Sequence, residues 1–233
     1  MLATLIPLFD ENVAVRAYSL FAQKENFLLN PSLLGTGRND GAASIAGIDI
    51  IDSMGIETLS VDCDIFVEVN NISVFSDIDS GVHASHDRLV LLIDPTITPE
   101  DMYINRLKEL KKMGYKIAIR KLPVGNFEEY QEILMLMDYI LLDHKKINIR
   151  NAKIFFGKVY PNIKLCAVNV DSQEDFDKLK ADGGFDLYEG LFFRVPVTKG
   201  EEEVAPLKIN YIELLNLVNA NDFELTKAAD VIG

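Results

Sequence analysis

Short apolar runs recur along this chain at a nearly constant interval, with longer amphipathic segments between them. Four of these runs contain Ile117, Ile140, Leu165 and Leu187, which follow one another at intervals of 22 to 25 residues. An interval of this length accommodates one strand and one crossover helix, the repeating unit of parallel sheets. Apolar strands that alternate with helices favour a sheet whose faces are covered by those helices.

The number of predicted strands selects among the parallel architectures. Two N-terminal runs form a hairpin through Asp10-Glu11-Asn12, and six more runs follow. The eight predicted strands cover residues 3–9, 13–20, 64–69, 89–93, 116–122, 139–142, 163–170 and 185–188. Because eight strands suffice to close a barrel, we expect an α/β fold, a TIM-type (β/α)8 barrel with an antiparallel N-terminal strand. An open, doubly wound sheet is the alternative.

Polar residues mark the starts of two of the predicted helices. Thr98 is predicted to cap a helix of residues 99–113, and Asn126 a helix of residues 127–137. Glu129 lies where it would complete a capping box with Asn126. Both helices would cover the sheet between consecutive strands.

The charge balance limits the kinds of partner. The net charge of −13 disfavours non-specific binding to a nucleic-acid polymer, which depends on basic groups that neutralise phosphates. A small anionic ligand in a local basic pocket is compatible with it. No apolar run approaches the roughly 18 residues of a membrane-spanning helix, and no signal peptide is recognisable. Cys63 and Cys166 are interpreted as buried free thiols, so we expect a cytoplasmic protein without a membrane partner.

The charged run Lys199-Gly200-Glu201-Glu202-Glu203 interrupts the pattern of strands and helices. It predicts a barrel domain of residues 1–200, followed over residues 201–233 by a linker and a C-terminal helical segment. About thirty residues cannot bury a core of their own. We therefore expect this segment to dock elsewhere or to open a further, truncated domain.

Four segments resemble the EAL domain, in the order in which that family carries them. Residues 6–10 and 17–21 resemble its opening Gln-Pro-Ile and Gly-Tyr-Glu-Ala-Leu hairpin. The other three resemble its Gly-Tyr-x-Ile-Ala-Leu strand, its Ile-Lys-Ile-Asp strand and its closing Gln-Gly-Tyr-x-Phe…Pro, and they are residues 114–119, 139–143 and 185–196. The resemblance covers residues 4–197. Residues 206–220 are similar to the first helix of an HDOD domain, which follows the barrel in EAL–HDOD signalling proteins.

The resemblance concerns a family of metal-dependent enzymes, but this chain lacks most of the residues that the family uses for catalysis. Active EAL domains are phosphodiesterases that cleave cyclic di-GMP, and they use Mg²⁺ or Mn²⁺ to activate water. By the resemblance, the positions that hold the metals or serve the attacking water carry Ser19, Leu92, Arg120, Lys121, Leu141 and Val168 here. Glu68 occupies the position of the family's asparagine and Glu189 the position of its glutamine. The family's aspartate is retained as Asp143. The resemblance therefore implies a degenerate barrel that holds no metal and no other cofactor.

Electrostatics strengthens this expectation. Arg120 and Lys121 replace a pair of aspartates. Each cation at about 4 Å from a metal would repel it by roughly 4 kcal/mol per unit charge at an effective dielectric constant of about 20. Strand alternation predicts that only one of the two faces the barrel mouth. Its side chain is expected either to form an internal ion pair or to hold a phosphate.

The candidate ligand-binding residues are the charged groups expected at the strand ends, namely Glu68, Arg120, Lys121, Asp143 and Glu189. His144 follows Asp143 and could serve as a general base, but a structural role is the favoured interpretation. His83, His86 and Asp87 are interpreted as an exposed polar loop.

Two classes of function are compatible with these residues. The first is a non-catalytic EAL-like module in bacterial signal transduction, which holds a protein partner or an adjoining HDOD domain, or binds cyclic di-GMP without hydrolysis. The alternative is an enzyme, either a residual cyclic di-GMP phosphodiesterase or a barrel enzyme that acts on a phosphorylated small molecule.

Overall fold

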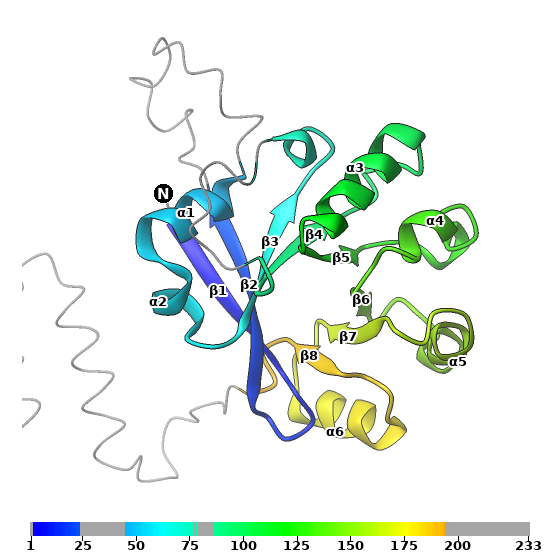
Figure 1. Ribbon diagram of the computed structural model, residues 1–233. Helices are drawn as coiled ribbons and strands as arrows, with labels where there is room; N and C mark the ends of the chain where they lie inside the picture. The colour runs from blue at the N-terminus through cyan, green and yellow to red at the C-terminus, as the bar shows by residue number, and fades with distance from the viewer. Residues whose placement is uncertain (1, 24–44, 77, 79–85, 194–233) are drawn as a thin grey trace, which may run out of the picture. The chain divides into compact units, whose positions relative to one another are not determined.

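The computed structural model describes residues 2–23, 45–76, 78 and 86–193, and every structural statement below concerns these residues (Figure 1). The predicted linker and helical region of residues 201–233 lie outside them, as do the predicted domain boundary at residue 200 and His83.

Within this part of the chain, eight strands form one closed barrel in chain order. β1 (Leu2–Phe9) pairs antiparallel with both of its neighbours, β2 (Val15–Gln23) and β8 (Leu187–Glu189). The remaining neighbours pair in parallel, through β3 (Asp64–Val69), β4 (Leu89–Ile93), β5 (Lys116–Arg120), β6 (Tyr139–Asp143) and β7 (Lys164–Val168). The predicted (β/α)8 barrel with an antiparallel N-terminal strand is confirmed, and the open-sheet alternative is wrong.

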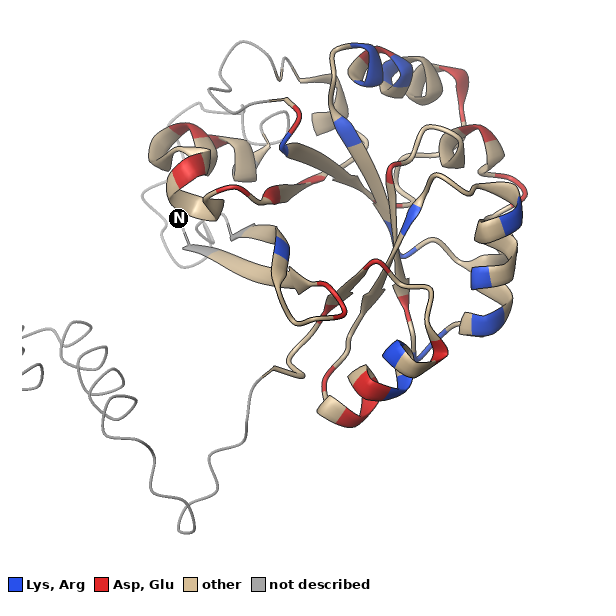
Figure 2. Cartoon of the chain, turned by 60° about the horizontal axis from the view of Figure 1, so that its bottom comes forward, with Lys and Arg blue, Asp and Glu red and all other residues tan. Residues whose placement is uncertain are grey.

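Helices cover the outside of this barrel (Figure 1). They are α1 (Ala46–Met54), α2 (Ile56–Ser60), α3 (Asp101–Lys112), α4 (Gln131–Leu134), α5 (Ile149–Val159) and α6 (Gln173–Asp182). Short 3-10 turns, η3 (Ser73–Phe75) and η4 (Val124–Asn126), follow β3 and β5. None of the helices in the described ranges is long and apolar enough to cross a membrane. Figure 2 shows that charged residues lie mainly on these helices and at the strand ends.

Alternation along the strands divides the core into two layers. In β4, Leu89, Leu91 and Ile93 pack outward against the helices, whereas Val90 and Leu92 point into the barrel. All five side chains are at most 2% exposed. Burying a side chain of this size stabilises the fold by about 1.5–3 kcal/mol, which explains why uninterrupted apolar runs form these strands.

The interior of the barrel is packed rather than hollow. It contains Leu8, Ala17, Phe66, Val90, Leu92, Ala118, Tyr139, Leu141, Cys166 and Leu187. Phe66 and Tyr139 meet edge to face with ring centroids 5.0 Å apart. Burial raises the pKa of the Cys166 thiol, so this group stays protonated. The prediction of buried free thiols is confirmed for Cys166, while Cys63 is free but only partly buried.

A polar cluster closes the barrel at the N-terminal ends of the parallel strands. The Lys116 Nζ donates to Asp64 at 2.8 Å, and the Tyr139 hydroxyl donates to the same carboxylate at 3.0 Å. The Lys164 ammonium lies 5.3 Å from the centre of the Tyr139 ring. Burial and the adjacent Asp64 charge raise the pKa of Tyr139 well above its ordinary value, so the phenol remains a donor.

Tyr139→Phe should lower the free energy of unfolding by about 1 kcal/mol, because it removes a hydrogen bond to a partly buried carboxylate. Urea unfolding at neutral pH measures this loss. Tyr160→Phe is the matched control, since the Tyr160 hydroxyl bonds to none of the other described residues, and it should change stability by less than about 0.5 kcal/mol. Equal effects of the two substitutions would contradict the assigned role of the hydrogen bond.

The caps predicted at Thr98 and Asn126 are wrong. α3 begins two residues late, with Glu100 as its N-cap, and the Thr98 hydroxyl instead donates to the Glu100 side chain at 2.9 Å. Asn126 ends the 3-10 turn η4, and its amide contacts Glu129 at 3.3 Å without starting a helix. Phe127 and Tyr130 are buried against the core. We attribute the shortened helix α4 to this packing, which sets the backbone path there.

Candidate functional site

The C-terminal ends of the parallel strands form the mouth of the barrel. Along each strand, every second side chain points into the barrel, as the interior packing of Leu92, Leu141 and Val168 shows. The same alternation brings Ser19, Glu68, Leu92, Arg120, Leu141, Asp143, Val168 and Glu189 to this end. The candidate positions, scattered along the sequence, therefore lie around one opening.

Arg120 is the central cation of the mouth. It lies two residues after the interior Ala118, and its guanidinium forms an ion pair with Glu68. The guanidinium also lies 5.3 Å from the centre of the Phe21 ring. Burial lowers the pKa of Arg120 and the nearby Glu189 charge opposes that shift. Arginine remains charged in proteins, so a fixed positive charge stands inside the mouth.

Lys121 follows Arg120 but leaves the strand. Its φ of 58° places its backbone in the left-handed region, and its side chain is exposed. Strand alternation therefore does not determine where Lys121 points, and both cations line one cavity at the mouth.

Glu189 lies opposite Arg120 and is tied to the second strand. The Ser19 hydroxyl, only 1% exposed, donates to Glu189 Oε2 at 2.9 Å. Burial raises the pKa of Glu189, while the Ser19 hydrogen bond and the Arg120 charge oppose this shift. The carboxylate is therefore held by a hydroxyl and a nearby guanidinium.

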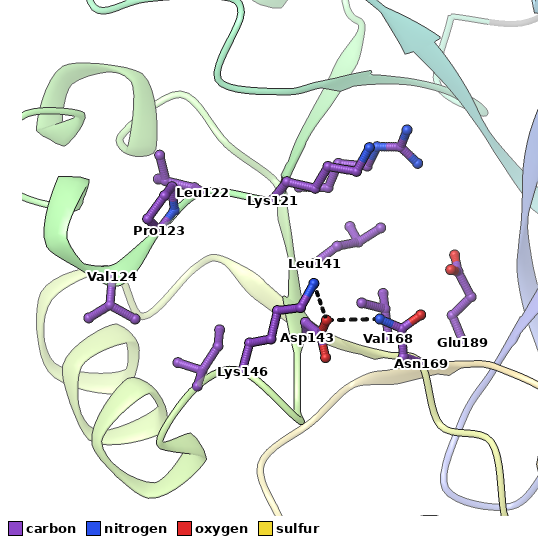
Figure 3. A pocket seen from close by; sticks show the side chains of 12 residues that line it. Lys121, Leu122, Pro123, Val124, Leu141, Asp143, Lys146, Val168, Asn169 and Glu189 are labelled. Carbon is purple, nitrogen blue, oxygen red and sulfur yellow. Dashed lines mark hydrogen bonds and ion pairs between the residues drawn. The ribbon is translucent and has the colours of Figure 1, made fainter.

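The Asp143 carboxylate is bound by three neighbouring groups, and Figure 3 shows two of these contacts. It accepts from the Lys146 ammonium at 3.1 Å, from the Asn169 amide at 2.9 Å and from the Lys145 backbone N–H at 3.1 Å. Burial alone would raise the pKa of Asp143, but these hydrogen bonds outweigh it and the pKa is lowered. His144 Nε2 lies 2.9 Å from the Asn169 carbonyl, which agrees with a structural role.

Gly190 sets how closely the chain after β8 approaches the loop after β7. A Cβ at this position would lie 2.0 Å from the Val170 carbonyl oxygen. The Val170 N–H donates to the Glu189 carbonyl at 3.1 Å, and the Phe192 N–H donates to the Val170 carbonyl at 3.1 Å. Glycine is therefore required next to Glu189, and it fixes the backbone that carries this carboxylate.

A cavity of about 490 Å³ opens over β5, β6 and β7 at the edge of the mouth. Its lining is Arg120, Lys121, Leu122, Pro123, Val124, Leu141, Asp143, Lys146, Ile147, Val168, Asn169 and Glu189. Figure 3 shows Pro123 and Val124 on one side and Glu189 on the other. Three of the lining residues are cations and two are anions, in a chain whose net charge is −13.

Lys146 and Asn169 contact Asp143 but are not among the site residues predicted from the sequence. Their signal was weak: Lys146 stands three residues after Asp143, and Asn169 follows an apolar strand. Asn169 has a φ of 62°, a conformation that asparagine tolerates better than most residues. His86 also differs from expectation, because its ring is 4.6 Å from that of Tyr115 and its Nδ1 is 3.1 Å from the Met113 carbonyl.

The carboxylates at the mouth are not suited to bind a pair of divalent metals. Hard cations require several free oxygen ligands. Glu68, Asp143 and Glu189 are each bound by a protein cation or hydroxyl, and Arg120 stands among them. Within the described ranges, no three His, Cys, Asp or Glu side chains are arranged to hold a metal.

Comparisons of the sequence with known proteins give a distant relative and no family model. No model of a protein family matches the chain. It is 25% identical over 232 residues to the uncharacterized protein YuxH of Bacillus subtilis (strain 168). The match covers 97% of this chain and 54% of YuxH, so the chain spans about half the length of that relative.

Solved structures are similar to this barrel in fold. The PaMucR phosphodiesterase in complex with c-di-GMP is similar with a TM-score of 0.61 and 15% identity, over 84% of this chain and 97% of that chain. The YkuI protein of Bacillus subtilis, with an EAL domain and bound c-di-GMP and calcium, has a TM-score of 0.54 and 15% identity, over 99% and 70%. The fold is EAL-like. At this identity the likeness extends to the fold alone.

Proposed function

We propose that this chain is a non-catalytic EAL-type signalling module that binds cyclic di-GMP at the barrel mouth without hydrolysing it. The observation that carries this proposal is the position of Arg120, which faces into the mouth and pairs with Glu68. A guanidinium thus occupies the place where the resemblance calls for a metal-binding carboxylate.

The remaining mouth residues support the loss of catalysis. Hydrolysis of a phosphodiester by the EAL route needs a metal that turns water into a nucleophile near neutral pH. Leu92, Leu141 and Val168 offer no ligand or base at their strand ends. Ser19 is buried and donates to Glu189, and Asp143 is occupied by Lys146 and Asn169.

Binding is supported by the cavity. Its volume of about 490 Å³ lies within the usual range of small-molecule sites, roughly 300–1,000 Å³. Cationic side chains match the phosphates of a nucleotide, and its apolar wall matches a base. The structures of PaMucR and YkuI are complexes with c-di-GMP, which makes this ligand the first candidate. We propose that a protein partner or an adjoining HDOD-type domain reads out the bound state.

Calorimetric titration of the full chain with cyclic di-GMP tests the proposal. We expect stoichiometric binding with the same Kd in excess EDTA and in excess Mg²⁺, because the protein's own cations replace the metal. Cyclic AMP serves as the control nucleotide and should bind at least about tenfold more weakly, a difference of about 1.4 kcal/mol. Absence of binding, or binding that requires Mg²⁺, would contradict the proposal.

A further inference from the structure

The three cations that line the cavity have different surroundings. The Arg120 guanidinium is turned into the barrel and committed to Glu68. Lys121 forms no hydrogen bond or ion pair with any other described residue. Lys146 has an 80% exposed side chain, and Asp143 is its partner at 3.1 Å. Two cations therefore remain available to an anion that enters the cavity, and one of them, Lys121, has no competing carboxylate among the described residues.

The backbone at Lys121 is unfavourable for a lysine. A φ of 58° is one that glycine adopts readily and that residues with a Cβ adopt at a cost. Such conformations persist where the surroundings impose them, and they cluster at binding and active sites. Here the turn places the Lys121 side chain on the cavity lining, next to the apolar segment that follows it.

That apolar segment forms a wall suited to a flat ring. Leu122, Pro123 and Val124 line one side of the cavity, and Ile147 lines it beside Lys146. Val124 is 53% exposed, so its side chain is available for contact. A nucleotide combines the two features that this lining would recognise, a phosphate for the ammonium groups and an apolar ring face for the wall.

We propose that Lys121 and Lys146 together hold one phosphate of a nucleotide without a metal ion, with the base against Pro123 and Val124. This inference rests on the proposed function, because it assigns the ligand contacts at the same mouth. Arg120 then acts mainly as the internal counter-ion of Glu68 and Glu189. The phosphate competes with Asp143 for Lys146, so Asp143 limits the affinity.

Lysine variants test this assignment by calorimetry in excess EDTA, with cyclic di-GMP and with GMP as probes. Lys121→Met and Lys146→Met should each weaken binding about tenfold, the usual effect of losing one charge-assisted contact. Lys145→Met is the matched control, because Lys145 pairs with Asp171 and does not line the cavity. It should leave Kd within about twofold. Asp143→Asn should tighten binding, because it frees Lys146.

Lys121→Gly separates a binding role from a structural one. Relief of the unfavourable φ should raise Tm by roughly 2–4 °C, while the loss of the ammonium weakens binding as Lys121→Met does. A lysine kept for stability would give a lower Tm instead. That result would overturn the assignment of Lys121.

The outcomes for the two proposals are distinguishable. If the chain binds cyclic di-GMP but Lys121→Met and Lys146→Met behave like Lys145→Met, this inference is overturned while the proposed function stands. If GMP binds through the two lysines but cyclic di-GMP does not bind, the proposed ligand is wrong and this inference stands. If neither probe binds to the unmodified chain, both are overturned.

Discussion

Purified protein incubated with cyclic di-GMP and excess Mn²⁺ should form no linear product above the rate of a no-enzyme control. The acceleration of at least about 10⁶-fold that is typical of enzymes should be absent. The physical reason is the charge at the mouth, where Arg120 pairs with Glu68 and faces Glu189. Protein cations can neutralise a phosphate, but they do not generate hydroxide at neutral pH as a metal does.

Chromatographic separation of cyclic and linear dinucleotide measures this result, with the PaMucR phosphodiesterase as the positive control. Arg120→Asp should not restore activity, because Ser19, Leu92 and Val168 still occupy the other ligand positions implied by the resemblance. Metal-dependent turnover by the unmodified chain, retained after stringent purification, would refute the proposal of a non-catalytic module. Turnover by Arg120→Asp alone would show that one residue blocks an otherwise complete site.

Arg120→Met should lower the free energy of unfolding by about 2–3 kcal/mol at neutral pH. Removing one member of a buried ion pair leaves its partner uncompensated, at a cost of about 3–5 kcal/mol. The expected loss is smaller here because the Glu68 side chain is 44% exposed. Glu189, which is more buried, accounts for most of it. Urea unfolding measures the change. Lys121→Met is the control, because it removes the neighbouring cation, which pairs with no other residue in the described part of the chain.

The pH dependence of this loss should identify Glu189 as its source. Burial raises the pKa of Glu189, and Arg120 opposes that rise. A carboxyl whose folded pKa is raised stabilises the fold below its unfolded pKa, and that contribution is lost as pH rises through the folded pKa. Without Arg120 the folded pKa rises further. The deficit of Arg120→Met should therefore be small near pH 4 and grow towards about pH 7.

A double variant completes this test. Glu189→Gln in the Arg120→Met background should recover most of the lost stability, because it removes the uncompensated charge while keeping an acceptor for Ser19. A deficit that is independent of pH and unaffected by Glu189→Gln would show that Arg120 contributes through packing against Phe21 instead.

Periodic features of the fold were predictable from the sequence. The strands of residues 64–69 and 89–93 have the predicted bounds, and the antiparallel opening followed from a hairpin with a polar turn. These features depend on adjacent residues, because a run of apolar side chains can be buried on both faces only in a covered strand. Alternation within a strand likewise predicted that one of the two cations faces the mouth, but it does not apply to Lys121, which follows the strand with a φ of 58° and lines the same cavity as Arg120.

The start of α4 and the cavity were decided by tertiary structure. Asn126 is an acceptable cap by its side chain alone, but Phe127 and Tyr130 are buried, and we attribute the different backbone path to their packing. Ser19 and Glu189 are 170 residues apart and meet only because the barrel closes. Lys146 and Asn169 converge on Asp143 from the loops after neighbouring strands. Local periodicity determines which face of a strand a residue occupies, whereas the partner across the mouth depends on strand order, register and closure, which no local pattern encodes.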